Sequence, residues 1–231
     1  MFTRSARIYD AIYGGQDYAA AGRRVQEHIQ RLAPEARDLL DVGCGTGRHL
    51  EHLRDHYAVE GLDLSPELLA VARERLPDVP LHTADMAEAD LGRRFDVVTC
   101  LFSAIGYVRT ADRLEATLAR MAGHLRPGGV ALVEPWFTPE AYWPRHLVAN
   151  FHEEPDLRVA WMYVHARRDD VSVLDIQYLV GEPEGVEHFT ERHELGLFTD
   201  AQYRGAFAAA GLHAEHDPEG LFGRGLYLAT A

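Results

Sequence analysis

The sequence predicts a single α/β domain of the doubly wound type, in which helices cover both faces of a mostly parallel sheet. Residues 39–42 form a short apolar run that enters a glycine-rich turn, and helical spacing alternates with further apolar runs up to residue 136. Continuous apolar strands separated by helices are typical of a parallel sheet buried on both faces. The length of 231 residues suits one large core and is short for two.

The elements of this sheet follow one another along the chain. A helix is expected over residues 17–32, the first strand at 39–42, and a helix from Thr46 onward. The second strand covers residues 57–65, where Ser65 caps a helix that has Pro66 at its first position. Apolar runs predict the third strand at 80–86 and the fourth at 94–102, followed by a helix at 111–125, a turn at 126–129 and a fifth strand at 130–136.

The pattern changes after Trp136. Residues 137–157 contain many aromatic residues and prolines and predict an irregular segment. Three β-like runs follow at 158–167, 172–180 and 186–198 with no helix between them, which predicts an antiparallel patch appended to the main sheet. A helix at 199–211 and a last strand at 223–230 close the chain. We therefore expect one domain over residues 1–231, with a core from about 1–136 and 199–231 and an insert from about 137–198.

The composition argues against several classes of protein. A formal net charge of −13 disfavours binding to phosphate polymers, so we expect no nucleic-acid partner. No apolar run reaches the roughly 18 residues of a membrane span, and the first residues do not resemble a secretory signal, so a cytoplasmic location is expected. The two cysteines and the scattered histidines lack metal-site spacing. All 23 basic residues are arginines, which excludes lysine Schiff-base chemistry and a P-loop.

The turn after the first strand carries the strongest chemical signal. It reads DVGCGTG, from Asp41 to Gly47. Glycine lets the backbone turn tightly and brings amide N–H groups close to a ligand, and the N-terminus of the following helix favours a negative group such as a carboxylate. A dinucleotide site would space its glycines as G-x-G-x-x-G, and an acid at position 41 would repel a pyrophosphate. The pattern suits a ligand with a cationic group, such as the α-ammonium of a methionine moiety.

Acidic residues also follow the second and third strands. Asp63 ends the second strand, where nucleotide-binding α/β folds place an acid on the ribose hydroxyls. Asp85 and Met86 follow the third strand, where a carboxylate can accept from an adenine amino group and a thioether can lie on the ring. Each acid alone could be a helix cap or a loop residue. Together with Asp41 they lie at the carboxyl ends of successive strands, so one edge of the sheet would hold all three.

This combination resembles the class I S-adenosylmethionine (SAM) dependent methyltransferases, whose fold is a Rossmann-like doubly wound sheet. The resemblance implies SAM as the cofactor. It implies that the cofactor is held by Asp41, Gly43, Cys44 and Gly45 at the methionine end, Asp63 at the ribose, and Asp85 with Met86 at the adenine. It also implies that the end of the fourth strand, from Leu101 to Ser103, borders the sulfonium.

A closer resemblance covers nearly the whole chain. The sequence is similar to the dTDP-amino-sugar N,N-dimethyltransferases of desosamine- and mycaminose-type antibiotic pathways in stretches such as LLDVGCGTGRHLEHL, CLFSAIGYV, HLRPGGVALVEPWFTPE, RHELGLFTDAQYRGAFAAAGL and GRGLY. The resemblance implies N-methylation of a dTDP-linked amino deoxysugar, and an insert that covers this substrate. It also implies that Arg224 contacts the diphosphate and that Tyr9 and Tyr18 close over SAM. Relatives are commonly dimers, so a homodimer is an option for this chain.

Three positions depart from the pattern of that family. Asp63 replaces a more usual glutamate, Ala104 replaces a serine near the substrate, and Trp136-Phe137 replaces a pair of tryptophans. A 4-amino sugar therefore stays open beside a 3-amino sugar.

Methyl transfer to an amine needs alignment more than it needs a strong base, and positioning supplies on the order of 7–11 kcal/mol. Tyr107, after the fourth strand, is the first candidate for a polar group beside the amine, and Glu134 at the end of the fifth strand is the second. Candidates for substrate contact are Ser103, Trp136, His165 and Arg224. Three alternatives remain: methylation of another small molecule, SAM binding without turnover, and an NAD-type oxidoreductase, which the glycine spacing disfavours.

Overall fold

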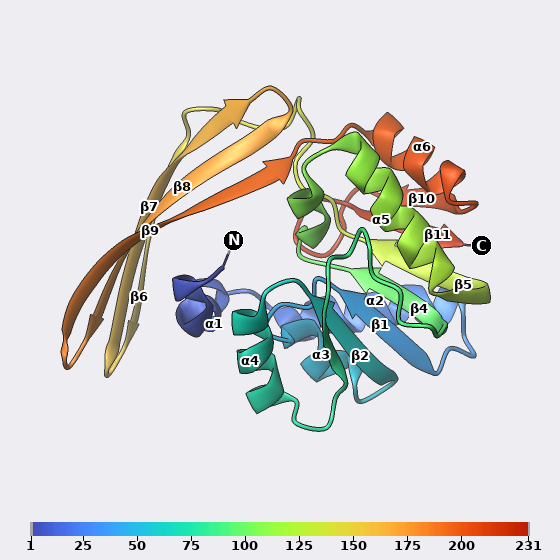
Figure 1. Ribbon diagram of the computed structural model, residues 1–231, viewed down its shortest axis with the longest axis horizontal. Helices are drawn as coiled ribbons and strands as arrows, with labels where there is room; N and C mark the ends of the chain where they lie inside the picture. Colours follow the sequence, from blue (N-terminus) through green and yellow to red (C-terminus); the bar gives the residue numbers. More distant parts are fainter. Residues whose placement is uncertain (1, 231) are drawn as a thin grey trace.

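The computed structural model describes residues 2–230 and contains two sheets (Figure 1). The larger sheet has seven strands in the order β10-β11-β5-β4-β1-β2-β3. The five strands from β5 to β3 are parallel, while β11 pairs antiparallel with both β5 and β10. The strands are β1 (Asp38–Val42), β2 (Ala58–Asp63), β3 (Leu81–Thr83), β4 (Phe95–Cys100), β5 (Leu125–Val133), β10 (His213–Asp217) and β11 (Leu226–Thr230).

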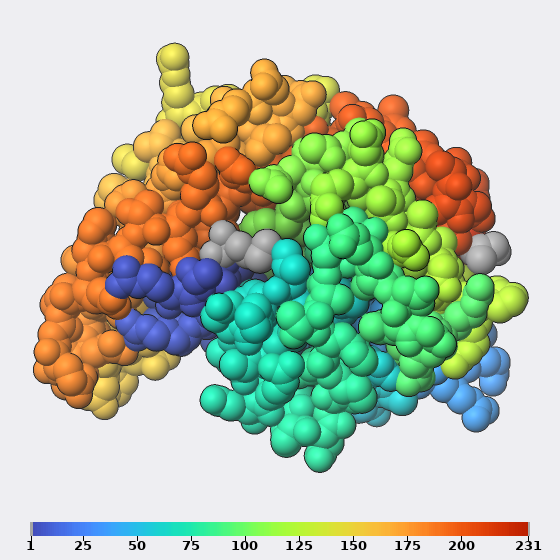
Figure 2. Space-filling view, viewed as in Figure 1, coloured from blue at the N-terminus to red at the C-terminus, as the bar shows by residue number. Residues whose placement is uncertain are grey.

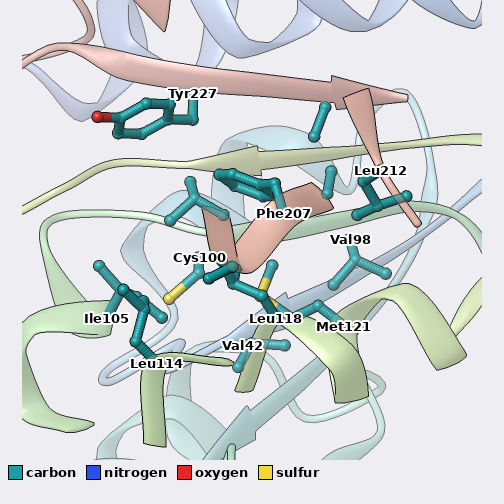
Figure 3. Packing of buried hydrophobic residues seen from close by; sticks show 14 of the residues in the cluster. Val42, Val98, Cys100, Ile105, Leu114, Leu118, Met121, Phe207, Leu212 and Tyr227 are labelled. Carbon is teal, nitrogen blue, oxygen red and sulfur yellow. The ribbon is translucent and has the colours of Figure 1, made fainter. Parts of the chain in front are cut away.

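Helices cover both faces of this sheet, as the apolar strands require. Successive residues of one strand enter different cores: Leu40 packs with α5 (Ala111–Gly123) and α6 (Asp200–Ala209), whereas Leu39 packs with α2 (Tyr18–Leu32), α3 (Arg48–Leu53) and α4 (Pro66–Arg75). Figure 3 shows the first of these cores, where Leu114 and Leu118 of α5 face Val98 and Cys100 of β4. This architecture confirms the predicted doubly wound fold.

Side chains and proline fix where these helices begin. Asp17, Ser65, Thr110 and Thr199 each accept a hydrogen bond from a backbone N–H in the first turn of α2, α4, α5 and α6. Such caps satisfy amides that have no partner inside the helix. The predicted cap at Ser65, with Pro66 at the first helical position, is confirmed.

The segment after Trp136 forms a sheet of its own. It contains four antiparallel strands in the order β6-β7-β8-β9, namely β6 (Leu147–Glu154), β7 (Leu157–Arg168), β8 (Val171–Glu182) and β9 (Gly185–Gly196). In Figure 1 this sheet, yellow to orange, stands beside the main sheet. The predicted antiparallel patch is therefore confirmed, and within residues 2–230 it is a separate sheet, since none of its strands pairs with a strand of the larger sheet.

Several boundaries also differ from the prediction. Residues 147–154 form β6 instead of an irregular segment, and most side chains of this edge strand are exposed, so its sequence lacks the alternation of a half-buried strand. The helix predicted to Leu125 ends at Gly123, and the predicted turn at 126–129 lies inside β5, where β4 shifts its register. The short strand β10 was not predicted. It pairs antiparallel with β11, which corresponds to the strand predicted at 223–230.

The N-terminal segment lies between the two sheets. It contains the 3-10 helix η1 (Arg4–Ile8) and the short helix α1 (Tyr9–Tyr13). Phe2 and Ala6 pack on Leu68 of α4, while Ile8 and Ile12 join the core of the antiparallel sheet. Figure 2 shows this segment, in blue, filling the space between the orange strands and the cyan region.

Two polar clusters fix the N-terminal segment in place. Glu191 of β9 accepts hydrogen bonds from the backbone N–H groups of Thr3, Arg4 and Ser5 and from the hydroxyls of Thr3 and Ser5. On the other side, Asp10 accepts from the Thr46 hydroxyl at 2.8 Å and pairs with Arg75 of α4. The segment is therefore bound both to the antiparallel sheet and to the main domain.

Candidate active site

A cavity of about 520 Å³ lies between the carboxyl ends of the parallel strands and the inner face of the antiparallel sheet. The N-terminal segment contributes part of its wall through Phe2, Tyr9 and Tyr13. The cavity brings together twelve of the residues singled out in the sequence: Tyr9, Gly43, Gly45, Asp63, Asp85, Met86, Leu101, Ser103, Tyr107, Trp136, His165 and Arg224. The carboxyl ends of the parallel strands and the antiparallel sheet therefore face one space.

A second, small cavity of about 30 Å³ lies beside it, behind the glycine turn. Five residues line both cavities: Tyr9, Gly43, Gly45, Leu101 and Phe102. Three further predicted residues, Tyr18, Asp41 and Cys44, line only the small cavity. The predicted cofactor residues are thus divided between two adjoining spaces.

The glycine turn has the backbone that its sequence predicts. Gly43 and Gly45 have φ angles of +74° and +56°, in the left-handed region that side chains other than glycine rarely adopt. A Cβ atom at Gly43 would lie 2.6 Å from the Cβ of Ala104, so no larger residue fits there. At Gly45 a Cβ would meet nothing within 4 Å, which leaves open space above the turn for a ligand.

Asp41 is a buried carboxyl group at the end of β1. Its side chain accepts a hydrogen bond of 2.7 Å from the Thr99 hydroxyl of β4, and it makes no ion pair within the described residues. Burial raises the pKa of Asp41 from 3.8 to about 7, and the nearby Asp63 adds to this effect. A buried carboxylate of this kind is stabilised by a cation placed beside it.

Asp63 and Asp85 lie at the ends of β2 and β3 and are held in different ways. Asp63 accepts hydrogen bonds of 2.8 Å from the backbone N–H groups of Gly45 and Ser65. Burial nevertheless raises the pKa of Asp63. Asp85 makes two hydrogen bonds, of 2.7 and 2.6 Å, with one terminal nitrogen of Arg113 from α5. Both acids are therefore oriented by contacts within the protein.

Glu134 is fully buried and does not line the cavity. One carboxylate oxygen accepts from the backbone N–H of Phe102 at 2.7 Å, and the other accepts from Arg224 at 2.9 Å. Burial raises the pKa of Glu134, although Arg224 opposes this shift. Since both oxygens already have partners, this geometry holds Arg224 in place and favours that role over direct proton transfer to a substrate.

Arg224 lines the cavity between aromatic rings. Its guanidinium carbon lies 5.3 Å from the ring centre of Phe102 and 5.8 Å from that of Phe222. The Nε atom is buried and has no hydrogen-bond partner among residues 2–230. The side chain can therefore donate further hydrogen bonds to an anionic ligand.

Tyr107 lies on η2 (Ala104–Val108), directly after β4. Its hydroxyl is 2.9 Å from Nδ1 of His193 on β9, and burial raises its pKa well above the ordinary value. Tyr107 therefore stays protonated at neutral pH. Ser103, just before η2, donates its hydroxyl to the carbonyl of Pro135 at 2.6 Å.

Trp136 and His165 belong to the aromatic wall of the cavity. The indole N–H of Trp136 donates to the hydroxyl of Ser172 at 2.9 Å. The His165 ring is stacked on both Tyr142 and Tyr163, with centroid distances of 5.1 and 5.5 Å. Burial lowers the pKa of His165, so the ring is neutral at pH 7. These contacts fit a wall that packs against a substrate.

Some residues of the cavity were not predicted. Tyr13, Arg113, His146 and His193 all line it. The position of Tyr13 one turn after Tyr9 was an available signal, since residues four apart share a helix face. Arg113, His146 and His193 lie on elements whose place relative to the cavity depends on tertiary packing, and no local pattern marks them.

The residues present fit SAM. The uncompensated Asp41 suits an ammonium group, the space above Gly45 admits a ligand close to the backbone, and Asp63 presents a fixed carboxylate to hydroxyl donors. Among the described residues, no group of three or more His, Cys, Asp or Glu side chains is arranged to hold a metal ion. Nor does any helix of that part have the length and apolar character needed to cross a bilayer.

Comparison with known proteins agrees with this geometry. A family model described as a methyltransferase domain matches residues 39–129. The dTDP-3-amino-3,6-dideoxy-α-D-glucopyranose N,N-dimethyltransferase of Streptomyces fradiae is 43% identical over 96% of this chain and 89% of its own length. The dTDP-4-amino-2,3,4,6-tetradeoxy-D-glucose N,N-dimethyltransferase of Saccharopolyspora spinosa is 42% identical over 96% of this chain and 91% of its own.

A solved structure extends the similarity to the whole fold. SAM-bound CalS10, an amino pentose methyltransferase from Micromonospora echinaspora involved in calicheamicin biosynthesis, is 39% identical and superposes with a TM-score of 0.88. The match covers 100% of this chain and 97% of that one. With its fold, its glycine turn and these relatives, the chain belongs to the SAM-dependent dTDP-amino-sugar N,N-dimethyltransferase family.

Proposed function

We propose that this protein methylates the amino group of a dTDP-linked 3-amino or 4-amino deoxysugar to the N,N-dimethyl form, in the biosynthesis of a natural product. The observation that carries the proposal is the cavity of about 520 Å³, which has Asp63 and Asp85 on one wall and Arg224 with the aromatic inner face of the antiparallel sheet on the others. Relatives that act on 3-amino and 4-amino sugars are 43% and 42% identical to this chain, so identity does not choose between the two positions.

The cofactor acids have separate roles in this proposal. Asp41 holds the ammonium group, Asp63 the ribose hydroxyls, and Asp85, oriented by Arg113, the adenine amino group. Met86 packs beside Gly43, where its methyl carbon would be 3.5 Å from an added Cβ, and it offers an apolar surface to the base. Tyr9, Tyr18, Cys44 and Leu101 complete the walls of the two cavities.

The substrate is held on the opposite side. Arg224, kept in place by Glu134, donates hydrogen bonds to the diphosphate, since a guanidinium matches phosphate oxygens in geometry and charge. Trp136 and His165 form the wall against the sugar nucleotide, and Ser103 closes the wall near the reaction centre. We propose that residues 137–198 cover the substrate, and that the rest of the single domain binds the cofactor and contributes Ser103, Trp136 and Arg224 to the substrate side.

Alignment supplies the rate enhancement. When bound, SAM supplies a methyl group on a positively charged sulfur, and its transfer to a neutral amine leaves a neutral thioether and an ammonium ion that loses a proton to water. The chain's residues fix the amine near the methyl group and enclose it within the cavity. No strong base is required, because an amine close to neutral pH exchanges its proton with water.

Product analysis tests the function. Purified protein is incubated with SAM and, separately, with dTDP-3-amino and dTDP-4-amino deoxysugars, and products are identified by mass spectrometry. We expect two successive methyl additions on one of the two classes. If no dTDP-amino sugar gains a methyl group while an aglycone amine or hydroxyl does, the substrate assignment is wrong; if SAM binds and nothing is methylated, the protein senses SAM.

We also propose that the chain forms a homodimer through the outer face of the antiparallel sheet and acts in the cytoplasm. Strand pairing places on this face the exposed side chains of Leu147, Phe151, Met162, Val164 and Leu179. Exposed apolar patches of this kind mark protein interfaces. Light scattering should give twice the monomer mass for the wild type and the monomer mass for Phe151→Glu; a monomeric wild type contradicts the proposal.

A further inference from the structure

The inner face of the antiparallel sheet places a polar chain behind Tyr107. Nδ1 of His193 is 2.9 Å from the Tyr107 hydroxyl. Nε2 of the same ring is buried, has no hydrogen-bond partner among residues 2–230, and lies 3.8 Å from a carboxylate oxygen of Glu191, within ion-pair but not hydrogen-bond distance. His193 and Glu191 are both buried, and they lie two residues apart on β9, so their side chains share the inner face. Tyr107 and His193 both line the cavity.

The surroundings of His193 determine which nitrogen carries its proton. Burial disfavours ionisation of Glu191, but hydrogen bonds from Ser5 and Thr3 outweigh it and lower the pKa of this carboxyl, so Glu191 is a carboxylate at neutral pH. Burial also lowers the pKa of His193 to about 4, so the imidazole is neutral. A neutral ring has one N–H, and electrostatics favours the tautomer in which that N–H is Nε2, the atom that faces the carboxylate.

The consequence for Tyr107 follows from hydrogen-bond directions. If Nε2 carries the proton, Nδ1 is an acceptor and the Tyr107 hydroxyl donates to it. The proton of Tyr107 then points away from the reaction centre, and the lone pairs of its oxygen are free to face the cavity. An oxygen in this state can accept a hydrogen bond from an amine N–H, but it cannot donate to the amine and so cannot occupy the nitrogen lone pair.

We propose that His193 is a positioning residue for methyl transfer: it fixes the Tyr107 hydroxyl as a hydrogen-bond acceptor, which orients the amine with its lone pair directed at the methyl group. This inference rests on the proposed function. In this inference His193 does not contact the reacting atoms. Glu191, which binds the N-terminal segment, also selects the tautomer of His193.

A double-mutant cycle tests whether His193 acts through Tyr107. His193→Leu removes the acceptor at similar volume, Tyr107→Phe removes only the hydroxyl, and each should lower kcat about tenfold, as loss of one orienting hydrogen bond does. The double variant should be no slower than Tyr107→Phe alone. Losses that multiply to about a hundredfold would overturn the inference, because His193 would then act independently of Tyr107.

A conservative variant separates positioning from packing. The side-chain oxygen of asparagine can occupy the place of Nδ1, so His193→Asn should keep kcat within about threefold of the wild type. An equal loss of kcat in His193→Asn and His193→Leu would contradict the inference. His213→Leu, the same substitution at an exposed position of β10, is the matched control and should leave kcat unchanged. Titration with S-adenosylhomocysteine (SAH) should give the same affinity for every variant, which shows that the cofactor site is intact.

The tautomer can also be observed without turnover. Nitrogen NMR of histidine-labelled protein should show His193 protonated at Nε2 at pH 7, and protonation at Nδ1 would overturn the inference even in an active enzyme. If the wild type is active and the cycle is additive, only the role of His193 fails. If the wild type methylates no amino sugar, the proposed function fails first and the inference with it.

Discussion

Replacement of Asp41 by asparagine should make the protein more stable at high pH while it weakens cofactor binding. In the ligand-free protein this buried carboxyl group has no cationic partner within residues 2–230, and burial raises its pKa from 3.8 to about 7. Asparagine can still accept the hydrogen bond from Thr99 but never ionises. The variant therefore removes the cost of the buried charge.

The size and sign of the effect follow from the two pKa values. Because the pKa is higher in the folded protein, the folded state loses stability as the pH rises from the unfolded value near 3.8 through the folded value near 7, and no further loss occurs above it. A shift of about three units, at about 1.4 kcal/mol each, corresponds to about 4 kcal/mol. About 3 kcal/mol of this develops between roughly pH 4.5 and 8.

Urea denaturation of wild type and Asp41→Asn across that pH range measures the effect. The difference in free energy of unfolding should move in favour of the variant by about 3 kcal/mol from roughly pH 4.5 to 8 and stay constant above that. The amide itself can add a constant difference in the free energy of unfolding, which does not change how the difference depends on pH. Asp78→Asn, which replaces an exposed carboxylate, is the control and should follow the wild type.

Calorimetry with SAH gives the functional half of the same prediction. An ammonium group favours ionised Asp41, so wild-type affinity should weaken by up to tenfold for each pH unit below about 7. The variant should bind weakly, with little dependence on pH. If the difference in stability does not change with pH, or if the variant binds SAH as tightly as the wild type, Asp41 is not the ammonium site.

Three further variants test other contacts. Arg224→Ala should raise KM for the sugar nucleotide at least tenfold with unchanged SAH affinity, because a charge-assisted bond to the diphosphate is lost; an unchanged KM removes Arg224 from the site. Arg113→Ala should raise KM for SAM several-fold, since Asp85 loses the partner that orients it, and steady-state kinetics with no such rise would exclude that role. Arg75→Ala should speed SAH release in stopped-flow measurements, as Asp10 no longer holds the N-terminal segment, whereas an unaltered rate would show that this contact does not restrain the cofactor.

The parallel core was predictable because its signals are local. Glycines 43, 45 and 47 all have positive φ, as a turn of that sequence requires, and the apolar strands beside it occupy the centre of the sheet. The position of the acids at the strand ends could be predicted from topology, since the carboxyl ends of parallel strands lie at one edge of the sheet. What the sequence pattern could not show is that Asp41 lies behind the turn, in a separate small cavity.

The antiparallel sheet was harder to predict for physical reasons. Most side chains of the strand Leu147–Glu154 are exposed, so it lacks the apolar alternation that identifies a half-buried strand. The role of Glu134 was also hidden, because its partners Phe102 and Arg224 are 32 and 90 residues away in the chain. The role of His193 was hidden for the same reason, since His193 contacts Tyr107 only when β9 is folded over η2.

The central claim is that the two reactants meet in one cavity, with the cofactor on the strand ends and the sugar nucleotide under the antiparallel sheet. A crystal structure with SAH and a dTDP-amino sugar tests it most directly. We predict that the SAH ribose hydroxyls lie within hydrogen-bond distance of Asp63, and that the amine faces the sulfur from the side of Tyr107. A sugar nucleotide bound outside this cavity, or SAH bound away from Asp63, would contradict the account.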